Sequence, residues 1–134
     1  MMTSERGSLR RLQLTLALLM LWEAVSLVTE MSFGGPLFKA SGGDIGGALG
    51  GRGAFSGQAL VFLAIYFYGL VRGPLRHPGV LWVGLIEQAA AALFGIYHLV
   101  IGDLKVEATI APVAVSVALL ALLLVNMPRN TSAS

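Results

Sequence analysis

Two glutamates lie inside apolar stretches of this chain, where ionisable side chains are rare. Glu23 stands in "LLMLWEAVSLV" and Glu87 in "LWVGLIEQAAAALFG". An ionised carboxylate at the centre of a membrane helix costs about 2.5 to 3.5 kcal/mol, so burial favours its neutral, protonated form. Acids inside a membrane mark proton or ion pathways, or act as proton donors in catalysis. Glu23 and Glu87 are therefore the candidate catalytic residues.

Other polar residues recur near Glu87 at helical spacing. One face at steps of four, four and three residues carries Glu87, Ala91, Gly95 and His98, and Gly84 and Gly102 extend it. Residues at these steps share one side of a helix, so we expect this face to be buried. Gln88 stands beside it.

Depth along the helices predicts two polar clusters. The first, near the middle of the membrane, would join Glu23, Glu87, Gln88 and a tyrosine, either Tyr66 or Tyr68. The second, nearer the outer surface, would join Glu30, His98, Gln58 and Arg52. The candidate ligand-binding residues are Tyr66, Gln88, His98, Glu30 and Gln58. An alternative is that these side chains only form interhelical hydrogen bonds, worth about 0.6 kcal/mol each.

Composition places these residues in a membrane protein. The chain has 134 residues, 56% of them hydrophobic and 12% charged, and its mean hydropathy is +0.80. Soluble domains carry about 25% charged residues. The sequence contains no cysteine and two histidines, which excludes thiolate chemistry and predicts no metal site and no cofactor. The basic residues flank apolar runs, which favours a topological role over nucleic-acid binding.

Four apolar segments approach the roughly 20 residues that a helix needs to cross a membrane. They cover residues 12–31, 54–71, 80–101 and 108–127. The predicted fold is all-α, a single domain formed by a four-helix transmembrane bundle with a glycine-rich external connection between its first two helices.

Lysine and arginine favour the cytoplasmic side of a membrane. In the four-span topology one side carries Arg6, Arg10, Arg11, Arg72, Arg76 and Arg129, and the other carries Lys39, Arg52 and Lys105. We therefore expect a multi-pass protein of the cell membrane with both termini in the cytoplasm. An alternative is that residues 1–26 are a cleaved signal, since "AVS" ends there at cleavage spacing.

The segment "SGGDIGGALGGRGA" (41–54) is rich in glycine but does not match a phosphate-binding motif. A P-loop requires GxxxxGK[ST], and no lysine follows these glycines. Its glycines recur every four residues, which on a helix would form a flat strip for close packing. Residues 37–51 are predicted to be either a cap helix packed on the bundle or a flexible loop.

The four short spans, the long first connection and the run "GGRGAFSGQALVFLAIYFYGL" resemble the DoxX-like group of small bacterial four-helix membrane proteins. The resemblance covers the whole chain in topology. It implies a membrane subunit or partner of oxidoreductases and assigns no catalytic residue. The dense glycine repeat and the pair Glu87 and Gln88 are not explained by it.

Three functions follow from these observations. The leading hypothesis is a small subunit or partner of a larger membrane assembly, with a protein partner or further copies of the chain. The second is a small membrane enzyme or binding protein for a lipid-like ligand, in which Glu23 or Glu87 donates a proton. The third is an oligomeric conduit for protons or small solutes. The sequence does not decide whether the protein is an enzyme.

Overall fold

A computed structural model of the chain describes residues 2–33, 48–102 and 105–129. Side chains are described in these ranges except at 2–4, 30–33, 48–56 and 108. The fold is all-α, as predicted, and the described residues form four helices and no strand. The helices are α1 (Met2–Phe33), α3 (Ala48–Arg72), α4 (Gly79–Ile101) and α5 (Val106–Asn126). The predicted cap helix or loop at 37–51 lies outside the described residues, except that 48–51 begin α3.

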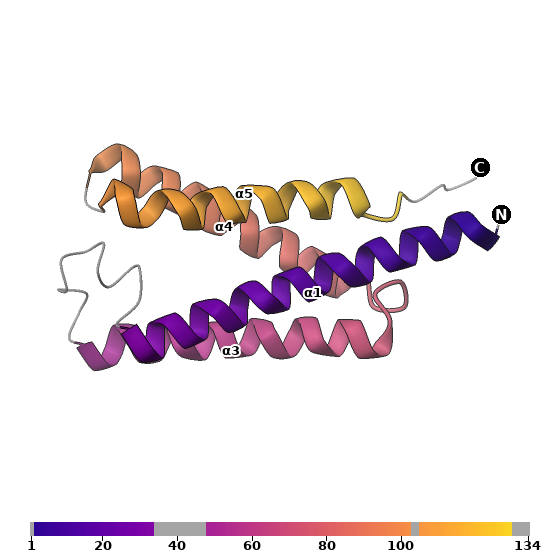
Figure 1. The fold of residues 1–134 in the computed structure, drawn as a ribbon, viewed down its shortest axis with the longest axis horizontal. Coiled ribbons are helices and arrows are strands. Elements are labelled where there is room, and N and C mark those ends of the chain that lie inside the picture. The colour runs from indigo at the N-terminus through magenta and orange to yellow at the C-terminus, as the bar shows by residue number, and fades with distance from the viewer. Residues whose placement is uncertain (1, 34–47, 103–104, 130–134) are drawn as a thin grey trace.

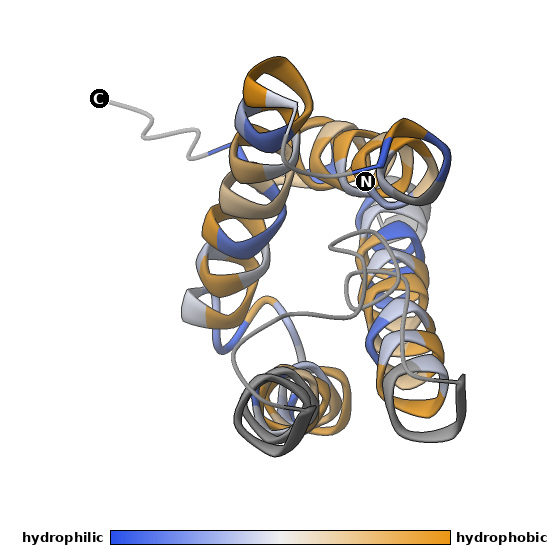
Figure 2. Cartoon of the chain, turned by 90° about the vertical axis from the view of Figure 1, so that its left-hand side faces the viewer, coloured by the Kyte–Doolittle hydropathy of each residue, from blue (hydrophilic) through white to orange (hydrophobic). Residues whose placement is uncertain are grey.

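The bundle consists of two antiparallel hairpins. Helix α1 packs along α3 and α4 packs along α5, while α1 and α5 form the main contact between the hairpins. Both termini lie at one end of the molecule, together with the connection between α3 and α4 (Figure 1). Seen from the opposite end, the helices occupy the four corners of a bundle, and apolar residues cover most of each ribbon (Figure 2).

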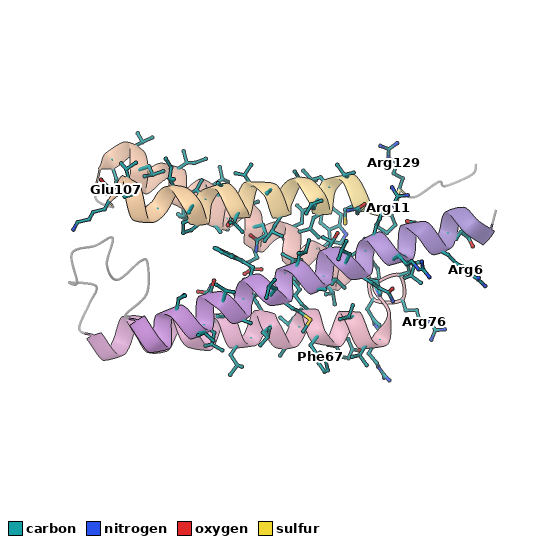
Figure 3. The ribbon with its side chains drawn as sticks, in the orientation of Figure 1. Arg6, Arg11, Phe67, Arg76, Glu107 and Arg129 are labelled. Carbon is teal, nitrogen blue, oxygen red and sulfur yellow. The ribbon has the colours of Figure 1, made fainter. Side chains whose placement is uncertain are left out.

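Three helices contain segments that are long and apolar enough to cross a membrane. These segments are Glu5–Thr29, Gly79–Ile101 and Thr109–Asn126, and a shorter apolar helix covers Gly57–Arg72. Large apolar side chains point away from the bundle along all four helices; Phe67, for example, is 56% exposed (Figure 3). In water such a surface would be unfavourable, whereas lipid covers it without loss. The chain is therefore a membrane protein.

Glycines with positive φ angles end α3 and α4. Gly73 has φ +95° and accepts hydrogen bonds from the backbone N–H groups of Arg76 and His77, which closes the turn into α4. Gly102 has φ +75° and its N–H donates to the carbonyl of His98, a left-handed helix cap. Both conformations favour glycine because a Cβ atom would be strained there.

The apolar core lies nearer to the termini than to the opposite end. Its buried members are Leu12, Leu16, Leu19, Tyr66, Val80, Leu81, Leu119 and Leu123. Within α4 the buried residues are Val80, Leu81, Gly84, Gln88 and Ala92. The predicted buried face is therefore correct at Gly84 and wrong at Ala91, which is exposed, while Glu87 is half-buried.

Close packing at Gly84 accounts for the direction of the buried face of α4. A Cβ atom on Gly84 would lie 3.2 Å from Leu19 Cδ1, 3.3 Å from Tyr66 Cε1 and 3.4 Å from Leu123 Cδ1. Side chains of α1, α3 and α5 thus converge on the bare backbone of α4. This contact directs Gly84 to the bundle axis, and Gln88, one turn further along, lies about 100° around the helix from Glu87.

Two glycines of α3 provide a test of this packing. A Cβ atom on Gly69 would lie 2.6 Å from Val80 Cγ1, whereas one on Gly57 would meet nothing within 4 Å. We expect Gly69→Ala to lower the free energy of unfolding by about 1 to 3 kcal/mol, because the branched Val80 cannot move aside. Gly57→Ala should leave it unchanged or raise it by up to about 1 kcal/mol. Thermal or SDS unfolding in detergent micelles measures both, and equal stabilities would contradict the packing of α3 on α4.

Candidate functional site

Glu23 lies in the interior of the bundle. It is one helical turn beyond Leu19 on α1, on the side facing α4, and its side chain is 5% exposed. Leu19 packs at Gly84, so Glu23 lies near the level of Glu87 and Gln88, which are one turn beyond Gly84 on the parallel helix α4.

Glu87 joins α1, α3 and α4 through its carboxyl group. The hydroxyl of Tyr66, on α3, donates a hydrogen bond to Glu87 Oε2. The carboxyl group of Glu23 lies within interaction range of the carboxyl group of Glu87. We call Glu23, Glu87 and Tyr66 the carboxyl cluster. The structure thus brings together three of the residues predicted for the mid-membrane site and selects Tyr66 as its tyrosine.

The proximity of the two carboxyl groups has a chemical consequence. Two ionised carboxylates offer only acceptors, so a hydrogen bond between them requires a proton on one of them. Two adjacent negative charges would also repel each other strongly in a medium of low dielectric constant. A proton on one of the two carboxyl groups would remove this repulsion and allow them to share a hydrogen bond.

Tyr66 is fixed in place by its surroundings. Its side chain is fully buried, with 0% exposure, and its ring stacks on that of Phe62 with centroids 6.2 Å apart. The ring edge also packs at Gly84. This packing holds the hydroxyl towards Glu87. Tyr68, the other candidate, is 47% exposed and its ring instead lies against His77, with centroids 5.3 Å apart.

Gln88 lies beside the carboxyl cluster with an unused acceptor. Its side chain is 1% exposed, and its Oε1 atom has no hydrogen-bond partner among the described residues. A buried acceptor without a partner costs about 1 to 3 kcal/mol. Gln88 therefore offers the interior a further acceptor for a proton-bearing group.

The predicted outer cluster stays a prediction, because the described residues include the side chains of only two of its four members. Gln58 is exposed. His98 is half-buried, and its ring lies against that of Tyr97 with centroids 5.3 Å apart. The side chains of Glu30 and Arg52 lie outside the described residues. Among the residues that the structure describes, no group of three or more His, Asp or Glu side chains could hold a metal ion.

A second polar contact was not found from the sequence. Asn126 Nδ2 donates to Thr15 Oγ1 at 3.2 Å, and this hydroxyl donates to the backbone carbonyl of Arg11 at 2.8 Å. The bond joins α1 to α5 near the termini. Helical spacing within α1 places Thr15 on the same face as Leu19 and Glu23, eight residues along the helix, and this spacing could have identified it.

Comparisons with protein-family models, with curated proteins and with solved structures found no significant match. The resemblance to DoxX-like proteins therefore stays a prediction.

The hydrogen bond from Tyr66 to Glu87 can be measured with a double-mutant cycle. We expect Tyr66→Phe to lower the free energy of unfolding by about 1 to 3 kcal/mol, because it removes a donor to a buried carboxyl group. In a Glu87→Gln background the same change should cost less, with a coupling energy of about 0.5 to 3 kcal/mol. Tyr68→Phe, on the same helix, is the matched control and should have little effect. Additive effects of Tyr66→Phe and Glu87→Gln would show that the two side chains do not interact.

Proposed function

We propose that this protein binds and releases a proton in the membrane interior at Glu23 and Glu87, and that this exchange carries protons across the membrane. One observation supports the proposal most: the buried carboxyl group of Glu23 lies beside the half-buried carboxyl group of Glu87 within a single chain, and Tyr66 donates a hydrogen bond to Glu87. Intramembrane carboxyl groups of this kind are typical of proton relays.

Charge balance favours a small cation at this site. Every described lysine and arginine side chain is exposed. Arg6, Arg11, Arg76 and Arg129 lie at the end with the termini, away from the middle of the bundle (Figure 3). Hence no described basic side chain neutralises the carboxyl cluster. A proton neutralises it directly and needs no added space beside Gly84, where even a methyl group would be crowded.

The other hypotheses stay predictions. A subunit role in a larger assembly is compatible with the exposed apolar residues, but lipid would cover them equally well. A lipid-like ligand would have to lie outside the tightly packed level of Gly84, Leu19 and Leu123. The subunit role and the lipid-ligand role are each compatible with a carboxyl cluster that exchanges protons.

The orientation is proposed from the arginines. Arg6, Arg11, Arg76 and Arg129 gather at the end that holds both termini, and Glu107 marks the opposite end (Figure 3). Lys105, the residue before α5, belongs to the Glu107 end. By the positive-inside rule, the end with the termini would face the cytoplasm, and the proposed location is the cell membrane.

Proton flux into liposomes tests the proposed function. The full chain, reconstituted with a pH-sensitive dye inside, should transfer protons when a membrane potential is imposed. Glu23→Gln and Glu87→Gln should each reduce the flux to that of empty liposomes, because an amide cannot exchange a proton at neutral pH. Glu107→Gln, which changes an exposed carboxyl group at the end of the bundle, is the matched control and should retain it.

Circular dichroism and gel filtration check that each variant is folded and monodisperse. Unchanged flux in the Glu23 and Glu87 variants, or no flux from the native chain, would contradict the proposal.

A further inference from the structure

The half of the bundle between the carboxyl cluster and the termini is filled by large apolar side chains. Its buried residues include Leu12, Leu16, Leu19, Val80, Leu81 and Leu123. The buried Thr15 hydroxyl in this half has a donor, Asn126, and an acceptor, the Arg11 carbonyl. Water would gain little by entering this half, because the described polar groups there already have partners and the rest is apolar.

The other half has a different interior. Beyond the cluster, towards Glu107, the buried side chains among those that the structure describes are Ala59, Ala92, Thr109 and Ser116. The first two and Ser116 lie seven or eight residues from the central contacts of their helices, Tyr66, Gly84 and Leu123. This is about two turns, so they share one level, roughly 11 Å beyond the centre. At this level small and hydroxyl side chains replace the leucines.

The two hairpins are also joined unequally. The hydrogen bond between Thr15 and Asn126 ties α1 to α5 near the termini. Towards the end marked by Glu107, the ribbon of α1 and α3 diverges from that of α4 and α5 (Figures 1 and 3). The hydrogen bond between the hairpins thus lies in the half of the bundle whose interior is most apolar.

Gln88 adds an independent indication of where protons arrive. It lies at the boundary between the two halves, and its buried Oε1 atom is unpaired among the described residues. Such an atom can accept a hydrogen bond from water, from a hydronium ion or from a protonated carboxyl group. An acceptor at this position suits a step between solvent and the carboxyl cluster.

We infer that, in the conformation of this structure, protons reach Glu23 and Glu87 from the Glu107 end of the bundle, past Ser116 and Gln88, while the leucine-filled half closes the way to the termini until the helices rearrange. The titratable groups at the cluster are Glu23 from α1, Tyr66 from α3 and Glu87 from α4. Helix α5 contributes Leu119 and Ser116 near this level. The inference rests on the proposed proton site and adds the side from which that site is loaded.

Cysteine labelling tests the route, and the cysteine-free chain makes single-cysteine variants unambiguous. The probe is a small, charged methanethiosulfonate reagent, which reacts only with thiols that water reaches. It is applied to one side of sealed membranes that contain the full chain, and Glu107→Cys identifies the side that carries the Glu107 end. Ser116→Cys should react with reagent on that side and not with reagent on the other.

Two control positions on α5 distinguish access of water along this route from a general exposure of the helix to water. Ala118→Cys faces outward and is exposed, so in lipid it should stay unlabelled from either side. Leu123→Cys, buried in the apolar half, should also stay unlabelled. Lack of reaction at Ser116→Cys from the Glu107 side, or rapid reaction at Leu123→Cys from the other side, would overturn the inference. Because labelling requires no proton transfer, a failed route and a failed proton site would be told apart.

Discussion

The structure depends on the difficulty of keeping two carboxyl groups charged beside each other in an apolar interior. Glu23 and Glu87 can share a hydrogen bond only if one of them carries a proton. With no described lysine or arginine in the interior to compensate them, protonation is the simplest way to make the site compatible with the membrane. The same requirement makes the site responsive to protons, which links the stability of the bundle to its proposed function.

Packing makes this arrangement possible. Gly84 allows side chains from three helices to approach the backbone of α4, and the adjoining turn places Gln88 and Glu87 opposite Glu23. Tyr66 takes part in both features, since its ring packs at Gly84 and its hydroxyl donates to Glu87. A glycine at the centre of the bundle therefore has a direct effect on the chemistry one turn away. Because one half of the core is filled with leucine, we infer that protons reach the two glutamates from the other half.

Much of this was predictable from the sequence. Hydropathy predicted four helices near their observed positions, and the rarity of acids in apolar runs identified Glu23 and Glu87. Depth along the helices grouped them with Tyr66, but could not choose between Tyr66 and Tyr68 because both were near the same level. The spacing places Gly84 correctly on the buried face of α4 but continues that face through Ala91, which is exposed, where the structure buries Gln88 and Ala92. The close approach at Gly84, a tertiary contact that no single helix reveals, determines that face instead.

Infrared spectroscopy of the full chain in lipid, titrated with pH, tests most directly whether the two glutamates share a proton. A protonated carboxyl group has a C=O stretching band that a carboxylate lacks. We expect the native chain to show this band at neutral pH, at a frequency that shifts when Tyr66 is replaced by phenylalanine, and we expect the band to change in both Glu23→Gln and Glu87→Gln. A native spectrum with no protonated carboxyl band at neutral pH, or a band insensitive to both glutamine variants, would contradict the shared proton.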